Sequence, residues 1–120
     1  MVLLRLALVA VCLAFATSAS AGDMVIQQAT WYCGKYHGRL MANGQRYDCH
    51  DTSTVAANKR LRLRLGARVR VTNTANGRTL DAVVRDRSPK SLLDVSLGGA
   101  RLLGFERQGI ATLRVAIISN

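Results

Sequence analysis

The sequence lacks an apolar run long enough to cross a membrane, an internal repeat and a low-complexity linker. Its longest apolar stretch, Leu6 to Ala16, has about eleven residues, whereas a membrane-spanning helix needs roughly 20. Arg5 precedes this stretch and the small residues Ala19-Ser20-Ala21 follow it, a pattern typical of a cleaved secretory signal peptide. We therefore expect residues 1–21 to be removed, residues 22–120 to form a single domain, and the protein to be secreted or periplasmic without a membrane anchor.

Acidic residues are also scarce, with 7 Asp and Glu against 17 Lys and Arg. Loss of Arg5 with the signal leaves 16 cationic residues against 7 acidic ones, a net charge of +9. Such a surface favours polyanions, which for an exported bacterial protein are teichoic acids, lipopolysaccharide or peptidoglycan carboxylates. Nucleic acid lies across a membrane and is not expected as a partner. Alternatively, the charge only keeps a small domain soluble.

Cysteine is rare as well. Cys12 lies in the middle of the apolar stretch and not at its end, so we do not expect a lipoprotein. The remaining pair, Cys33 and Cys49, is predicted to form a disulfide in an oxidising compartment. The alternative is a metal site that adds His37 and His50, but the spacing does not match the usual paired motifs. We expect no metal and no cofactor.

The clearest local structure is a hairpin. Residues Ala67 to Thr72 alternate apolar and polar side chains, which predicts a half-buried strand with Val69 and Val71 inward. Asn76-Gly77 predicts a turn, and Arg78 to Arg85 predicts the returning strand.

The other elements are short. Strands are expected at Gln27 to Tyr32, Leu92 to Val95 and Ile110 to Ile118, a turn at Ala42 to Gln45, and one or two helical turns at Thr52 to Asn58. A helix capped by Ser96 should end near Gly104. Its expected apolar face consists of Leu97, Ala100, Leu102, Leu103 and Phe105. This order predicts a small, mostly β barrel with one short helix near the C-terminus.

Several motifs follow one another in a specific order. They are Ala29-Thr30-Trp31-Tyr32, His37-Gly38-Arg39, Ala42 to Asp48, Leu65 to Arg78, Asp86-Arg87 and Leu93-Asp94-Val95-Ser96. In this order the chain resembles the rare lipoprotein A family of septal-ring peptidoglycan lytic transglycosylases. The resemblance implies a six-stranded double-psi β-barrel related to the first domain of expansins. It also implies peptidoglycan glycan strands as substrate and cell-division proteins as partners.

The resemblance further implies a lyase reaction. A carboxylic acid protonates the glycosidic oxygen and, as carboxylate, assists attack by the muramic acid 6-hydroxyl, which leaves a 1,6-anhydromuramyl end. The matching aspartates are Asp86 and Asp94, with Asp48 as a further candidate, and we expect cleavage to depend on Asp86. Alternatively, Asp86 is an ion-paired turn residue and Asp94 caps the helix.

The chain departs from the family at several positions. Gln45 replaces a glutamate, Asn58 replaces a histidine, Ser88 replaces a glycine, and the loop from Asp86 to Asp94 is about three residues shorter. Neither amide exchanges protons as a carboxyl does, although His50 could substitute for the missing imidazole. The alternative function is therefore a non-catalytic, expansin-like barrel that binds cell-wall glycan.

Aromatic and arginine side chains are the expected contacts to sugar rings and carboxylates. Trp31 is predicted to lie in the core and Tyr36 at the surface, with Tyr32 a further stacking candidate. The predicted substrate-binding residues are Tyr36, His37, Arg39, Gln45, Arg46, Tyr47 and Arg87.

Overall fold

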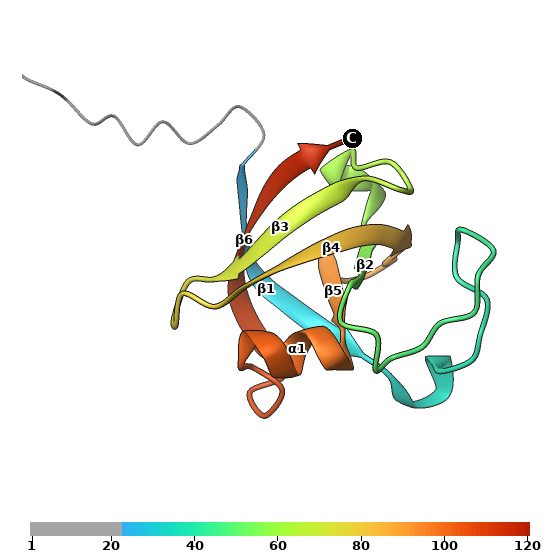
Figure 1. The fold of residues 1–120 in the computed structure, drawn as a ribbon, viewed down its shortest axis with the longest axis horizontal. Helices are drawn as coiled ribbons and strands as arrows, with labels where there is room; N and C mark the ends of the chain where they lie inside the picture. The colour runs from blue at the N-terminus through green and yellow to red at the C-terminus, as the bar shows by residue number, and fades with distance from the viewer. Residues whose placement is uncertain (1–22) are drawn as a thin grey trace, which may run out of the picture.

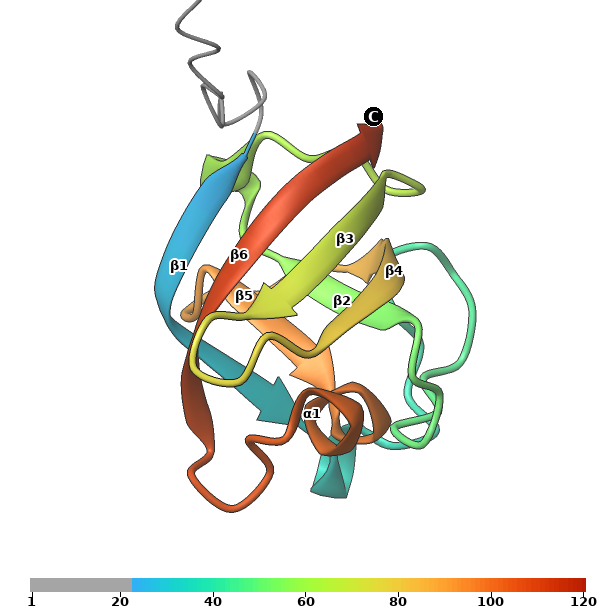
Figure 2. The same cartoon turned by 60° about the vertical axis from the view of Figure 1, so that its left-hand side comes forward.

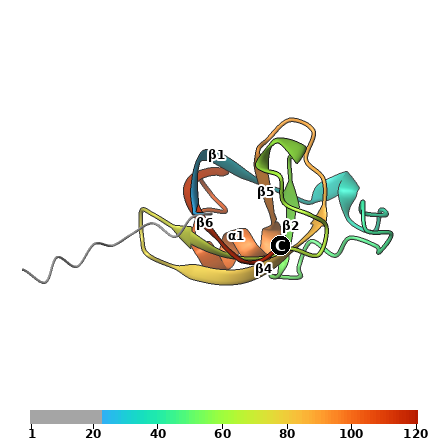
Figure 3. The same ribbon diagram turned by 90° about the horizontal axis from the view of Figure 1, so that it is seen from above.

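Six strands form a closed barrel in the computed structural model, which describes residues 23–120 (Figure 1). The elements are β1 (Met24–Tyr32), η1 (Gly34–Tyr36), β2 (Thr54–Ala57), η2 (Lys59–Leu61), β3 (Arg68–Asn73), β4 (Thr79–Asp86), β5 (Leu93–Ser96), α1 (Leu97–Leu103) and β6 (Ile110–Ser119). Around the barrel the strands follow the order β1-β5-β2-β4-β3-β6, and the view from above shows them enclosing one interior (Figure 3). The predicted signal peptide lies outside the described residues.

The predicted hairpin is confirmed. β3 and β4 are antiparallel, with Val69 opposite Ala82 and Val71 opposite Leu80. Both valines are fully buried, as the alternation predicts, because successive side chains of a strand point to opposite faces. Gly77 makes the turn with φ +74, a conformation that glycine adopts without steric cost.

The prediction of helical turns at Thr52 to Asn58 is wrong. Thr54–Ala57 is strand β2, which pairs in parallel with β4 and antiparallel with β5. All four residues are buried, so packing on both sides and two rows of ladder hydrogen bonds outweigh the helical propensity of Ala56 and Ala57.

Helix α1 covers one end of the barrel, and the start of β1 and the C-terminus lie at the other end (Figure 2). Ser96 caps the helix as predicted, since its hydroxyl accepts a hydrogen bond from the Gly99 amide at 3.0 Å. Gly104 ends it at φ +78. The predicted apolar face is wrong at one position, because Leu102 is 53% exposed. The other four predicted residues, Leu97, Ala100, Leu103 and Phe105, are buried.

The predicted disulfide is confirmed. Cys33 and Cys49 are bonded, with their Cα atoms 5.3 Å apart, and close a loop that follows β1. His37 lies beside this pair, and its Nδ1 accepts a hydrogen bond from the Cys49 amide at 3.2 Å. Both sulfur atoms are therefore used in the covalent bond. Within residues 23–120 no helix is long and apolar enough to span a membrane.

Gly98 is the point where α1 meets the disulfide loop. Its amide donates to the Cys49 carbonyl at 2.9 Å, and a Cβ atom at this position would lie 2.4 Å from the backbone oxygen of His50. Gly98→Ala should therefore lower the free energy of unfolding by about 2 kcal/mol, because backbone must move to relieve the overlap. Urea unfolding measures this, with exposed Leu102→Ala as a control that should change stability by about 0.5 kcal/mol or less. An unchanged midpoint for Gly98→Ala would show that this close contact does not exist.

Candidate active site

A hollow of about 340 Å³ opens on the wall formed by β1, β5, β2 and β4. Its lining combines aromatic rings, two carboxylates and the loop between β4 and β5. The residues are Trp31, Tyr32, Tyr36, Ala56, Asp86, Arg87, Ser88, Pro89, Lys90, Ser91 and Asp94.

Strand register places the two aspartates in one row. Ala56 in β2 pairs with Asp86 in β4 on one side and with Asp94 in β5 on the other. Neighbouring strands are about 4.8 Å apart, so the two aspartate Cα atoms lie roughly 10 Å from each other. Residues opposite one another point to the same face of a sheet. Ala56, with its short side chain, therefore forms a floor between two carboxylates.

Asp86 accepts three hydrogen bonds from fixed donors. Its Oδ1 accepts from the backbone amides of Ala42 at 3.0 Å and Arg87 at 2.9 Å. Its Oδ2 accepts from the Tyr32 hydroxyl at 3.0 Å. A backbone N–H can only donate, so the bonds at Oδ1 leave no place there for a proton on Asp86. Oδ1 of Asp86 therefore acts only as an acceptor.

Asp94 has different partners, because its described side-chain contacts are all hydroxyls. Thr30 donates to Oδ1 and Ser88 donates to Oδ2, the latter at 3.0 Å. The Thr30 hydroxyl also lies 2.8 Å from the Ser91 hydroxyl. A hydroxyl both donates and accepts, so this chain of bonds can reverse when Asp94 gains a proton. Asp94 is therefore satisfied in either protonation state.

Three tyrosines support one side of the hollow. The Tyr32 and Tyr47 rings are stacked, with centroids 4.1 Å apart, and Tyr36 meets Tyr32 edge-on at 6.0 Å. Burial, and next the charge of Asp86, raise the pKa of Tyr32, so its hydroxyl keeps the proton that it donates to Asp86. Burial likewise raises the pKa of Tyr47, whose hydroxyl donates to the Tyr32 carbonyl at 2.7 Å.

Asn58 fixes the loop between the aspartates. Its side-chain amide donates to the Ser88 carbonyl at 2.8 Å, and its side-chain oxygen accepts from the Arg60 amide at 3.0 Å. Ser88 is buried and contacts Asp94 directly. Both polar atoms of Asn58 are thus used in structural bonds, and the residue acts on Asp94 only through Ser88.

A second hollow of about 270 Å³ continues the first. Both are lined by Tyr32, Tyr36, Asp86 and Arg87, and the second adds Arg39, Leu40 and Tyr47. The Arg39 guanidinium lies 5.8 Å from the centre of the Tyr36 ring. Together the two hollows form one groove with Asp86 at their junction, Asp94 in the first part and a cationic rim.

Known proteins resemble the chain over most of this barrel. It is 41% identical over 90 residues to the endolytic peptidoglycan transglycosylase RlpA of Neisseria meningitidis serogroup A, covering 72% of this chain and 36% of that protein. It is 37% identical over 95 residues to the protein of the same name from Vibrio cholerae, covering 77% and 35%. The barrel belongs to the RlpA family. The chain spans about a third of the length of these curated relatives, and no protein-family model matches it.

A solved structure resembles the RlpA-family barrel in fold. It is a Clavibacter michiganensis expansin in complex with cellohexaose, with a TM-score of 0.60 and 21% sequence identity, over 79% of this chain and 50% of that chain. The likeness, together with the six-stranded closed barrel, confirms the predicted double-psi fold.

The structure brings together some of the site residues predicted for this RlpA-family barrel. Asp86, Asp94, Tyr36, Arg39 and Arg87 all line the groove. Tyr47 also reaches the second hollow, but it is only 2% exposed and lies beneath Tyr32, so it offers little surface for stacking. Tyr36 is 45% exposed at the rim, as predicted.

Four other predicted residues lie outside both linings, in the disulfide loop. Asp48 binds the His50 amide and lies 4.0 Å from His37. Gln45 accepts a hydrogen bond from the Asn43 side chain, and Arg46 donates to the Gly38 carbonyl. The ring centres of His50 and His37 are 5.7 Å apart, and neither histidine lines the groove.

The sequence analysis missed the hydroxyl partners of Asp94. Thr30 was part of a family motif, and Ser88 was noted only as a departure from the family. Strand alternation could have indicated Thr30, because Thr30 and Tyr32 are two residues apart on β1 and each donates to one aspartate. Trp31, predicted to be core, is half-buried, lines the groove and donates to the Glu106 carbonyl.

Proposed function

We propose that this barrel cleaves peptidoglycan glycan strands as an endolytic lytic transglycosylase, with Asp94 as the acid and base. The observation that supports this most is the set of hydroxyl partners around Asp94. A group that must give up a proton and then recover one needs hydrogen bonds that suit both forms. The names of the relatives support the substrate class.

In the proposed reaction, protonated Asp94 donates its proton to the glycosidic oxygen as the bond from muramic acid C1 to that oxygen breaks. The Asp94 carboxylate then takes the proton of the muramic acid 6-hydroxyl, and the oxygen of that hydroxyl forms a bond to C1. The products are a 1,6-anhydromuramyl end and a free hydroxyl on the leaving sugar. No water is consumed, and Asp94 ends as it began.

Asp86 has a different proposed role. It accepts three hydrogen bonds at the junction of the two hollows. Positive charge develops at the sugar ring while the glycosidic bond breaks. We place the Asp86 carboxylate to stabilise that charge, with Tyr36 as the stacking surface and Arg39 and Arg87 as contacts to acidic substituents.

The second candidate function is glycan binding without cleavage. Two observations favour it: the side-chain nitrogen and oxygen of Asn58 each make a backbone contact, and Gln45 is bonded to Asn43 away from the groove. Neither residue can supply the acid that the family has at these positions. In this case the groove would hold a glycan strand as a binding surface only.

Digestion of stripped peptidoglycan strands separates the two functions. The protein should release fragments with 1,6-anhydromuramyl ends, which mass spectrometry identifies by a mass one water below that of the hydrolytic product. Gln45→Glu combined with Asn58→His serves as the comparison that restores the family residues. Retention of strands without any anhydro product, by both proteins, would leave the binding function in place of the enzyme.

A further inference from the structure

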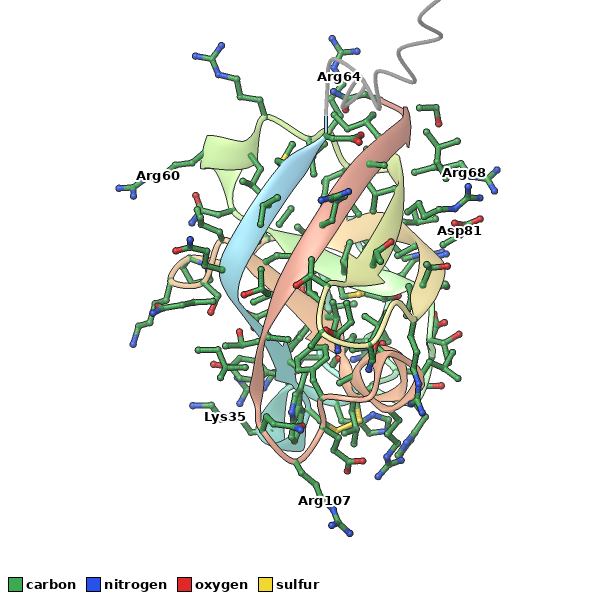
Figure 4. The ribbon with its side chains drawn as sticks, turned by 90° about the vertical axis from the view of Figure 1, so that its left-hand side faces the viewer. Lys35, Arg60, Arg64, Arg68, Asp81 and Arg107 are labelled. Atoms are coloured by element: carbon green, nitrogen blue, oxygen red, sulfur yellow. A yellow bond between two sulfur atoms is a disulfide. The ribbon has the colours of Figure 1, made fainter. Side chains whose placement is uncertain are left out.

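One end of the barrel carries five cations that the proposed reaction does not use. Between Asp51 and Asp81 the sequence has no acidic residue. The end opposite α1 carries the exposed side chains of Lys59, Arg60, Arg62, Arg64 and Arg68, which we call the basic end. In Figure 4, Arg60, Arg64 and Arg68 lie in this half of the barrel and point outward on different sides, whereas Lys35 and Arg107 lie at the other end.

Local structure turns these side chains outward. Leu63 is 2% exposed and anchors the segment in the core, while its neighbours Arg62 and Arg64 are exposed. The Leu63 carbonyl accepts a hydrogen bond from Arg87 at 2.8 Å. The segment is therefore fixed against the barrel by its apolar residue, and its cations face solvent.

Few acidic groups neutralise the basic end. In residues 24–120 the ion pairs of arginine involve Arg70, Arg85 and Arg101. The hydrogen bond from Arg70 is the main reason that the pKa of Asp81 is lowered, and the charge of Arg68 adds a smaller effect. Asp81 is thus already engaged by Arg70, with two bonds at 2.8 and 3.2 Å.

Apolar side chains lie among these cations. Leu65, within the segment, is 40% exposed. Ile118, which is 49% exposed, precedes Ser119, the strand partner of Arg68. Asn120 ties this chain end to the segment, because its side chain bonds the Arg64 amide and the Arg62 carbonyl. Exposed apolar side chains therefore lie within the cationic segment and in the strand end bonded to it.

We propose that the basic end binds the surface of a bilayer that carries anionic phospholipid headgroups. An arginine guanidinium can donate two parallel hydrogen bonds to phosphate oxygens, and each cation near such a surface contributes to the binding free energy. The apolar residues favour a lipid surface over a hydrophilic phosphate polymer. Leu65 and Ile118 add favourable binding free energy only where they can leave water and enter a headgroup layer. The inference is independent of the proposed function, because neither Asp86 nor Asp94 takes part.

The test compares two variants with the same change in charge. Arg60→Gln with Arg64→Gln removes two charges from the basic end, and Lys35→Gln with Arg107→Gln removes two from the opposite end (Figure 4). Exported protein is sedimented with vesicles of phosphatidylcholine and phosphatidylglycerol. The first variant should bind about thirtyfold more weakly than wild type, and the second should bind within about threefold of it. Unchanged unfolding midpoints establish that both variants are folded.

Two further arms test the choice of a lipid surface. Wild type should not sediment with phosphatidylcholine alone, and Leu65→Ser should weaken binding to the anionic vesicles by about tenfold without changing binding to polyphosphate. Equal loss in the two charge variants would show that net charge alone acts and would overturn the basic end as a site. Binding to polyphosphate together with unchanged vesicle binding by Leu65→Ser would overturn the lipid surface.

Discussion

Asp94→Asn is expected to lower the rate of anhydromuramyl product formation by about 10³-fold or more, because it removes the only group proposed to move protons. The fold should remain, since an asparagine can still accept from one of the two hydroxyls, Thr30 or Ser88, and donate to the other. The measurement is the initial rate of release from stripped glycan strands, with unfolding midpoint and binding to the strands as controls for structure.

Asp86→Asn is the matched comparison. The asparagine oxygen can still accept from the Ala42 and Arg87 amides, so the loops stay in place while the negative charge is lost. We expect a loss of about ten- to a hundredfold, as for a stabilising charge that transfers no proton. If instead Asp86→Asn is inactive and Asp94→Asn retains activity, the roles of the two aspartates are reversed.

The sequence predicted the two acidic residues of the groove but not the different roles that we propose for them. Asp86 and Asp94 were found from the Asp-Arg and Leu-Asp-x-Ser motifs, and the analysis favoured Asp86 as the acid. Motifs identify which residues lie on which strand. They do not show that Asp86 meets the Ala42 amide and the Tyr32 hydroxyl while Asp94 meets the Thr30 hydroxyl, because these three partners lie 44 to 64 positions away in the sequence. Such contacts depend on the closure of the barrel.

Local sequence patterns predicted correctly the elements whose structure depends on neighbouring residues in the chain. The β3–β4 hairpin, the Ser96 cap and the Gly104 helix end all depend on side-chain alternation or on backbone conformation. Strand β2 was mistaken for helical turns because its alanines have helical propensity, and only its position between β4 and β5 makes it a strand. The same position makes Ala56 the floor of the groove, which no local pattern could have indicated.

Asn58 shows how a departure from the family can be structural. Without alignment to a structure, its replacement of a histidine indicates only a lost imidazole. In the barrel it holds the Ser88 carbonyl, and the Ser88 hydroxyl contacts Asp94. The two departures are thus linked to each other and to a candidate catalytic group.

Replacement of both cysteines, Cys33→Ser with Cys49→Ser, is expected to cost about 3 kcal/mol of stability, because the free loop regains conformational entropy on unfolding. For a domain of this size that corresponds to a fall of about 15 °C in Tm, measured by thermal unfolding. The loop carries Tyr47 beneath Tyr32 and the Ala42 amide onto Asp86. Binding of glycan strands should therefore weaken as well, even at temperatures where the barrel is folded.

The control for this prediction is Asn43→Ala in the same loop. Asn43 bonds through its side chain only to Gln45 within the loop, and its backbone amide keeps the bond to the Arg85 carbonyl. We expect it to change stability by less than about 1 kcal/mol. Reduction of the wild type should reproduce the effect of the double serine variant on both Tm and glycan binding, because both treatments free the same loop. A lower Tm with unchanged glycan binding would mean that the disulfide stabilises the barrel without positioning Tyr32 and Asp86.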